Sequence, residues 1–326
     1  METQAIVGKS TPPNDPSRTP AMASLITCSY SGDFDVCGML CRSIDRFVPQ
    51  EIEHRLYVPR REIPLFSAFA SPRRKILAQE DLLARWFWKA PLPSPQWRER
   101  LGLSRRNLYL TPYSLPVRGW IAQQIMKLSA TLNAPTDVVA HLDSDIVIVR
   151  PLTIAHLMRD AHVRFHAQRA SAGIETQRPW YATAARLLGL PPADYSANLY
   201  IDQIVVWRRV IVEGLVARIE ASTGRDWQVA LARTPQFAEY VLYGMFVDHV
   251  LGPDAAGVYV EPDSLCYSRW TQRFSGAEEE DAFVRGLPGD QVACLIQSTI
   301  PMAIEERARV FDKATQWARQ TDARAA

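Results

Sequence analysis

The stretch DVVAHLDSDIVIVRPL, residues 137–152, decides the fold. Its two apolar runs have the length of buried strands, and Asp143-Ser144-Asp145 separates them. Side chains at positions i and i+2 of an extended chain point to the same side, so Asp143 and Asp145 should lie together where the first strand ends. Two buried carboxylates are costly unless a cation or hydrogen-bond donors compensate them. A divalent metal with oxygen ligands, Mg²⁺ or Mn²⁺, would do so. The alternative is a polar turn between two strands, because Asp and Ser favour turns.

Strands and helices alternate outward from this stretch. Apolar runs of strand length lie at 24–30, 54–59, 73–78, 106–111, 137–143, 146–149, 199–207, 257–261 and 291–297. Helical periodicity covers 34–47, 119–133, 178–189, 209–221, 236–250 and the last part of the chain. This alternation predicts an α/β fold with a mixed, mostly parallel sheet flanked by helices.

Composition narrows the class of protein. The chain has 326 residues, 37 Lys+Arg and 35 Asp+Glu, which give a net charge of +2. Such a balance does not indicate a nucleic-acid partner. No apolar run approaches the roughly 18 residues that a transmembrane helix needs. Five cysteines without a Cys-x-x-Cys pair indicate buried thiols in a reducing compartment.

The two ends of the chain differ from its middle. Residues 1–23 are rich in Pro, Ser, Thr and Asn, which predicts a disordered leader. They lack the compact apolar segment of a secretory signal, so we expect a cytoplasmic protein. One domain should occupy residues 24–300. Residues 301–326 have the pattern of an amphipathic, Arg-rich helix.

An Asp-x-Asp after a buried strand, followed by a short strand and Arg150-Pro151-Leu152, resembles the GT-A glycosyltransferases. The resemblance runs from about Ser24 to about Ser298 and is closest to a largely uncharacterised bacterial group of GT-A-like proteins. The supporting stretches are GWIAQQIMKL, WYATAARLLGL, EYVLYG and LIQST. It implies a GT-A-like, Rossmann-like fold and metal-dependent transfer of a sugar from a nucleotide-sugar donor. The acceptor would be a saccharide or a glycolipid, in bacterial surface-polysaccharide assembly.

The resemblance also implies roles for single residues. Asp143 and Asp145 would bind the metal and, through it, the donor diphosphate. The family often takes a third metal ligand, commonly a His, from a late segment, and this chain has Gln297 there. The loop after the first strand would hold the nucleoside through Tyr30 and Asp33. Asp33 is equally in position to cap the next helix.

The helix expected at 119–133 carries two stripes. Ile121, Ile125, Leu128 and Leu132 form the apolar stripe, and Trp120, Gln124, Lys127 and Thr131 form the polar one. The apolar stripe should face the sheet, and the polar stripe should look toward the aspartates. Gln124 and Lys127 are therefore candidate contacts of the diphosphate, since an ammonium tolerates many phosphate geometries. The alternative for Lys127 is a solvated lysine on an exposed face.

Glu239 is a carboxylate in a mostly apolar helical segment, FAEYVLYG. Its candidate roles are acceptor binding or general base for an inverting transfer. The alternative is a salt-bridged or exposed glutamate.

Two other functions stay open. The Asp-x-Asp also fits haloacid-dehalogenase-like phosphatases, with Asp143 as nucleophile and Asp145 as acid/base. Against this, the motif lies at mid-chain and lacks a convincing later lysine and acidic metal pair. The other function is a non-catalytic GT-A-fold protein that binds a nucleotide.

Residues 84–106 are rich in Trp, Pro and Arg and show no clean period. This insertion is expected to line an acceptor cleft or to contact a membrane surface at the periphery, where Trp and Arg are common. The alternative is that Trp86, Phe87 and Trp88 cover the core.

Overall fold

A five-stranded sheet forms the centre of the protein. The computed structural model describes residues 22–91, 107–170 and 174–325, so nearly all of the predicted leader lies outside the described residues. The strand order is β13-β7-β1-β2-β3. The bounds are β1 Ala23–Cys28, β2 Ile52–Val58, β3 Arg74–Ala78, β7 Val138–Leu142 and β13 Ile204–Arg208. β1 runs parallel to β2 and β7, and β2 parallel to β3, whereas β13 is antiparallel to β7. The predicted mixed, mostly parallel sheet is confirmed.

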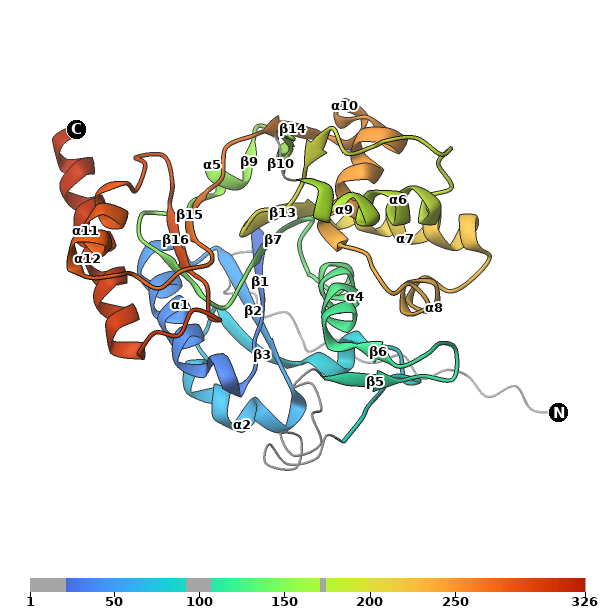
Figure 1. Ribbon diagram of the computed structural model, residues 1–326, viewed down its shortest axis with the longest axis horizontal. Coiled ribbons are helices and arrows are strands. Elements are labelled where there is room, and N and C mark those ends of the chain that lie inside the picture. The colour runs from blue at the N-terminus through green and yellow to red at the C-terminus, as the bar shows by residue number, and fades with distance from the viewer. Residues whose placement is uncertain (1–21, 92–106, 171–173, 326) are drawn as a thin grey trace.

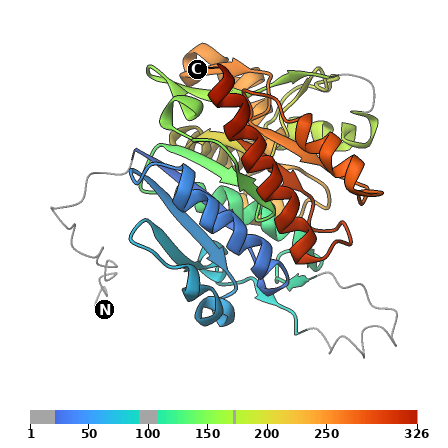
Figure 2. The same cartoon turned by 90° about the vertical axis from the view of Figure 1, so that its left-hand side faces the viewer.

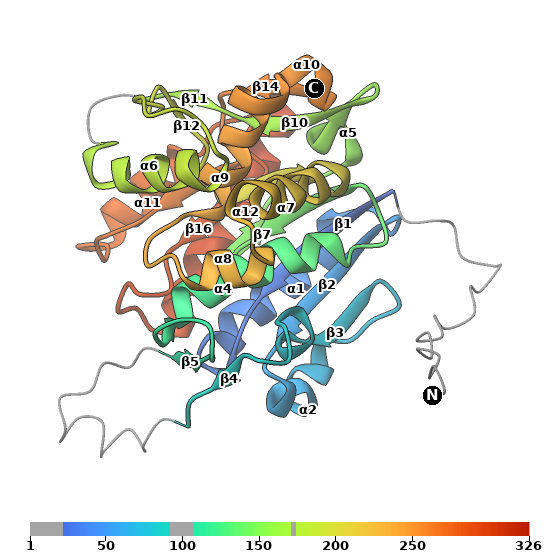
Figure 3. The same ribbon diagram turned by 90° about the vertical axis from the view of Figure 1, so that its right-hand side faces the viewer.

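Helices cover both faces of this sheet (Figure 1). On one face lie α1 (Phe34–Phe47) and α12 (Ile304–Ala325), which run side by side in blue and red in Figure 2. On the other lie α4 (Gly119–Leu132) and α7 (Arg209–Thr223), in front of the sheet in Figure 3. With both faces covered, every residue of β7 is buried. That burial explains why this strand is a continuous apolar run and not an alternating one.

Smaller sheets surround the central one. β15 (Cys266–Arg269), β16 (Ala293–Ile296) and β8 (Ile146–Ile148) form the first. β14 (Val258–Glu261), β10 (His162–His166) and β9 (Met158–Arg159) form the second. β4 (Trp88–Lys89), β5 (Leu108–Leu110) and β6 (Val117–Arg118) form the third, and β11 (Gln168–Arg169) pairs with β12 (Asn198–Leu199).

The remaining helices complete the shell. They are α2 Ile63–Phe66, α5 Ile154–Leu157, α6 Arg178–Leu187, α8 Trp227–Ala232, α9 Glu239–Phe246, α10 Pro253–Ala256 and α11 Ala277–Arg285. α11 and α12 pack on the β15-β16-β8 sheet through a second apolar cluster that includes Phe283 and Phe311. Among the described residues, no helix is long and apolar enough to cross a membrane.

The prediction of one continuous strand at 199–207 is wrong in its middle. Asn198–Leu199 form strand β12, residues 200–203 belong to no strand, and β13 begins only at Ile204. Side-chain hydrogen bonds explain the break. Ser264 Oγ donates to Asp202 at 2.7 Å, and Ser268 Oγ donates to Gln203 Oε1 at 2.8 Å. These bonds tie the segment before β13 to segments at and before β15, instead of to a neighbouring strand.

Helix α9 is buried along its whole length, and one glycine permits this packing. A Cβ atom at Gly244 would lie 2.2 Å from Cγ of Tyr200. Tyr200 cannot easily retreat, because its hydroxyl donates to Asp248 at 2.7 Å and its ring stacks on Phe165. The close approach of this helix therefore depends on glycine.

We expect Gly244→Ala to lower the free energy of unfolding by about 2 kcal/mol or more, because overpacking outweighs the gain in helix propensity. Gly214→Ala in α7 is the matched control, since its Cβ would meet Phe246 only at 3.5 Å, an ordinary contact. That variant should be neutral or slightly stabilising. Urea unfolding of both variants measures the difference, and equal effects would contradict the packing argument.

Candidate functional site

The site lies where β1 and β7 end. These strands are parallel, with Ile26 opposite His141, so the ends at Cys28 and Asp143 are neighbours. Ligands of open α/β sheets bind at such carboxyl ends. Burial raises the pKa of the Cys28 thiol to about 12. The Lys127 charge opposes this rise, and the charges of Asp143 and Glu239 add to it. Cys28 is therefore a neutral wall of the site and not a thiolate nucleophile.

Lys127 joins three groups that are far apart in the sequence. Its buried ammonium lies 3.0 Å from Glu239 Oε1 and 3.5 Å from Asp143 Oδ1. It donates to Tyr240 Oη at 2.9 Å and lies over the ring of the same tyrosine. Burial lowers the pKa of Lys127, but Glu239, Tyr240 and Asp143 together raise it well above its ordinary value. Lys127 is thus a permanent positive charge in the site, and the solvated-lysine alternative does not apply.

Glu239 is the first residue of α9 and is 2% exposed. Its backbone N–H, one of the groups that a helix start leaves without an intrahelical partner, donates to Gln124 Oε1 at 3.2 Å. A carboxylate in the first turn also interacts favourably with the helix dipole. α4 therefore fixes Glu239 twice, through the Gln124 amide and through the Lys127 ammonium.

Asp145 has a different environment from Asp143. Its Oδ2 accepts the backbone N–H of Ser298 at 2.7 Å, and the residue is 7% exposed. Burial, together with the charges of Asp143 and Asp33, raises the pKa of Asp145 to about 6. Asp143 is closer to solvent, with 40% of its side chain exposed. The Asp-x-Asp thus places one open and one buried carboxyl group side by side.

A second cation, Arg307 of α12, acts from the other side. Its buried guanidinium donates to the carbonyl oxygens of Ile296, Gln297 and Ile300. Burial lowers its pKa, whereas Asp145 and Asp33 raise it, which shows that both carboxyl groups feel its charge. Arg307 therefore stabilises the turn that presents Ser298 to Asp145.

Tyr30 and Asp33 follow β1 in the loop where the nucleoside was expected. Asp33 holds the N-cap position of α1, but its side chain makes no cap hydrogen bond and instead accepts from Ser144 Oγ at 3.3 Å. Burial raises the pKa of Asp33. The Tyr30 ring is about half exposed and lies over Gly32. Glu62 anchors the loop by accepting from the backbone and the hydroxyl of Ser31.

Gln297 directly precedes Ser298, and its side chain is half-buried. Within the described residues, no group of three or more His, Cys, Asp or Glu could hold a metal ion. Protein ligands to a divalent ion would therefore be Asp143 and Asp145, and Gln297 is adjacent in sequence to Ser298, which contacts Asp145. These are hard oxygen donors, the chemistry that Mg²⁺ and Mn²⁺ take, and the raised pKa of Asp145 marks negative charge that an ion would compensate.

The polar stripe of α4 divides in two. Gln124 and Lys127 reach Glu239 and Asp143, as described above. Thr131 is buried and pairs with His141 at 2.8 Å, and Trp120 is 41% exposed beside Trp180. Only the middle of the stripe belongs to the site.

Sequence reasoning missed four residues of the site: Cys28, Tyr240, Ser298 as a backbone donor, and Arg307. The sequence did point to Tyr240 and Cys28, because Tyr240 directly follows Glu239 and Cys28 lies at the end of the first strand. No sequence pattern distinguished Arg307 from the other arginines of the C-terminal helix.

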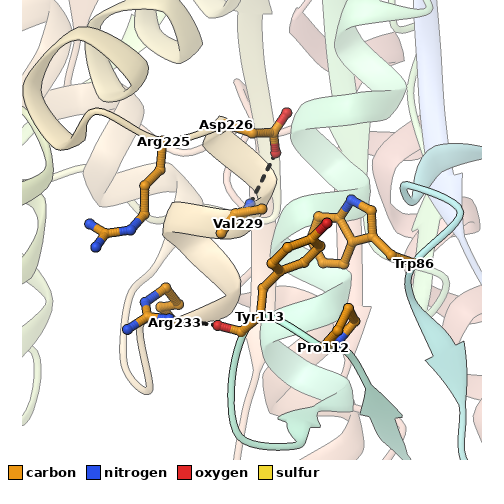
Figure 4. Close-up of a pocket in the computed structure, with 7 residues that line it drawn as sticks. All are labelled: Trp86, Pro112, Tyr113, Arg225, Asp226, Val229 and Arg233. Atoms are coloured by element: carbon orange, nitrogen blue, oxygen red, sulfur yellow. Dashed lines mark hydrogen bonds between the residues drawn. The ribbon is translucent and has the colours of Figure 1, made fainter.

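Two hollows lie away from the carboxylates. One, of about 550 Å³, is lined by Trp86, Pro112, Tyr113, Arg225, Asp226, Val229 and Arg233 (Figure 4). The other, of about 530 Å³, is lined by residues 114–118, Ile121 and residues 232–235. Trp86 and Phe87 pack against the core, as the covering alternative expected, but Trp88 is 57% exposed. Residues 92–106 of the insertion lie outside the described residues.

Residues 22–306 match a family described as "Family of unknown function (DUF6492)". The chain belongs to that family. No curated protein is similar enough in sequence to match.

The solved structures to which this DUF6492 chain is similar include three glycosyltransferases. One is the galactosyltransferase LgtC in complex with donor and acceptor sugar analogues, at 13% identity, TM-score 0.46, covering 91% of this chain and 95% of that one. Another is apo mouse xyloside xylosyltransferase 1, at 8% identity, TM-score 0.43, covering 86% and 99%. A third is the apo bifunctional glycosyltransferase WbbM, at 13% identity, TM-score 0.44, covering 94% of this chain and 52% of that one. These likenesses concern the fold alone.

Asp145→Asn should stabilise the protein at neutral and alkaline pH. The folded pKa of Asp145 is about 6, above its ordinary value of 3.8, so the folded protein binds the extra proton and gains stability as pH falls from about 6 to about 4. Above pH 6 the buried charge carries its full cost, about 1.4 kcal/mol per pKa unit. Asn removes that charge and keeps an oxygen for Ser298.

We therefore expect urea unfolding at pH 8 to show a gain of about 2 kcal/mol for Asp145→Asn, shrinking toward zero at pH 4. Asp143→Asn is the control. It should show no gain, because it removes the partner of Lys127. A pH-independent effect of Asp145→Asn would refute this account.

Proposed function

We propose that this protein is a metal-dependent glycosyltransferase that moves a sugar from a nucleotide-sugar donor to a saccharide or lipid-linked acceptor. One observation carries the proposal: Asp143 and Asp145 follow β7, and the Lys127 ammonium bridges Asp143 to the buried Glu239. This arrangement combines two oxygen ligands for a metal with a fixed cation and a further carboxylate.

Asp143 and Asp145, with Gln297, would hold Mn²⁺ or Mg²⁺. When bound, the ion would neutralise negative charge on the departing diphosphate. Asp143, the more open carboxylate, is the one that a diphosphate-bound ion would reach first. Ser298 and Arg307 keep the buried Asp145 carboxyl in place, so this ligand would need little rearrangement.

Lys127 and Gln124 would face the donor diphosphate from α4. A fixed charge costs no reorganisation as negative charge develops, so Lys127 would matter most while the diphosphate leaves. Its ammonium already has three partners, and a phosphate oxygen would compete with Asp143, the most distant of them at 3.5 Å. Tyr30 and Asp33, in the loop after β1, would contact the base and ribose.

Glu239 would contact the acceptor and, in an inverting transfer, take the proton of its hydroxyl group. Lys127 and Gln124 hold this residue from two sides, which is the positioning that a general base needs. Bacterial surface-polysaccharide assembly, at the cytoplasmic face of the inner membrane, is the setting we propose for a hexosyl or related transfer.

The metal and the nucleotide should bind together. In calorimetry with UDP and GDP, we expect binding that requires Mn²⁺ and that Asp145→Asn weakens at least about tenfold, or 1.4 kcal/mol. Asp254→Asn, an exposed carboxylate on α10, is the matched control. If Asp145→Asn binds like the wild type, the pair is structural and the proposal fails.

Glu239→Gln tests the catalytic carboxylate without removing its shape. We expect turnover with a panel of nucleotide sugars to fall by about a hundredfold or more, with the Kd for UDP or GDP and Mn²⁺ nearly unchanged. Glu213→Gln, on the exposed face of α7, should leave turnover unchanged. Equal turnover of Glu239→Gln and the wild type would leave Glu239 as only a partner of Lys127.

The phosphatase alternative makes a different prediction. It requires a phosphoryl group on Asp143, whose side chain pairs with Lys127. Trapping an aspartyl-phosphate, or its beryllofluoride mimic, on Asp143 by mass spectrometry would replace the transferase by the phosphatase.

A further inference from the structure

The β4-β5-β6 sheet turns an apolar face to solvent. Trp88 and Leu110 are directly opposite each other in the ladder, so their side chains share one face, and they are 57% and 44% exposed. The opposite face carries Tyr109 and Val117, which are buried. This small sheet therefore has its core side satisfied and still exposes large apolar side chains.

The loop between β5 and β6, residues 111–116, continues this surface. Figure 1 shows it at the end of the hairpin, below α8, and Arg233 donates to the carbonyl oxygen of Tyr113. Leu115 is 86% exposed and Tyr113 is 47% exposed, and Trp120 follows β6 at 41%. We call Trp88, Leu110, Tyr113, Leu115 and Trp120 the hairpin surface. Large exposed apolar side chains on and beside one small sheet indicate an interaction site.

Three arginines border the hairpin surface: Arg118, Arg225 and Arg233. Arg225 and Arg233 line the first hollow beside the loop (Figure 4). Arg118 and Arg233 line the second. Within the described ranges, Arg118 donates to the carbonyl oxygen of Pro235 and Arg233 to that of Tyr113. No carboxylate of the described residues forms an ion pair with the three. The carboxylate of Asp226, in the hollow that Arg225 and Arg233 line, accepts the backbone N–H of Val229 and so caps α8. The rim is therefore positively charged.

We propose that the hairpin surface docks the protein on an anionic lipid bilayer. Trp and Tyr prefer the headgroup region, a protruding leucine can enter it, and arginines bind lipid phosphates. An exposed apolar tip with arginines around it complements such a surface. A flat protein partner would leave Leu115 unmatched.

The hairpin lies at the start of α4, the helix that carries Lys127, so a membrane contact there would bear on the site. α4 begins at the hairpin and carries Ile121, which lines a hollow, and Lys127, about 9 Å further along the helix axis, at the carboxylates. A lipid-linked acceptor would thus reach the site from the docked edge. This last step rests on the proposed function, whereas the membrane contact rests on the surface residues alone.

Flotation with vesicles tests the docking on the full chain. We expect binding to phosphatidylcholine vesicles that contain roughly one-third phosphatidylglycerol, weaker binding to phosphatidylcholine alone, and a fall with added salt. Leu115→Ser should weaken the partition by about tenfold, the effect of one leucine side chain that no longer leaves water. Arg233→Gln should weaken binding to the anionic vesicles only. Leu65→Ser, an exposed leucine on α2, is the matched control and should bind like the wild type.

Three results would overturn the proposal. The wild-type protein could float with neither vesicle, or the Leu115→Ser variant could float as well as the wild type. The third is a dimer in light scattering that dissociates in Leu115→Ser, which would assign the surface to a second copy. Mn²⁺-dependent binding of UDP or GDP, measured without vesicles, separates the two proposals. If the wild-type protein shows no such binding, the transferase proposal is rejected and the membrane-docking proposal is unaffected.

Discussion

The buried ammonium of Lys127 is the contact on which the rest of the site depends. It joins α4, the end of β7 and the start of α9, and it is the cation that makes two nearby carboxylates tolerable. Removing one partner of a buried ion pair leaves a charge that nothing compensates, which costs several kcal/mol. The position of Glu239 and the pairing of Asp143 both depend on this one side chain.

The fold was largely predictable, because apolar runs and helical periods are local signals. The strand before Asp143 and the helix around Lys127 were found with bounds close to those observed. What failed was non-local. The strand at 199–207 is interrupted by hydrogen bonds from Ser264 and Ser268, some sixty residues later. Lys127, Asp143 and Glu239 were each named as candidates, but no sequence pattern showed that they meet at one ammonium. Nothing in the sequence distinguished Arg307 from its neighbours.

Different groups compensate the negative charges of Asp143 and Asp145, and the compensation of Asp145 is incomplete. Lys127 compensates Asp143, while Arg307 and the Ser298 N–H compensate Asp145 only in part, as its raised pKa shows. Natural proteins retain such local cost where a ligand uses it. A cation bound with the proposed donor would remove this cost, and α12, far from the motif in sequence, contributes to the environment of Asp145.

The contacts of the site also constrain how the chain folds. Lys127 and Tyr240 are 113 positions apart, and Asp145 and Ser298 are 153 apart. Contacts of such separation form late, since the chain entropy of closing long loops must first be lost. The strands can pair while the site is still unassembled, so a partly folded chain would have a sheet without these contacts. During synthesis, the support that Arg307 gives to the turn before Ser298 can form only after the start of α12 has left the ribosome, so the site is completed after the central sheet.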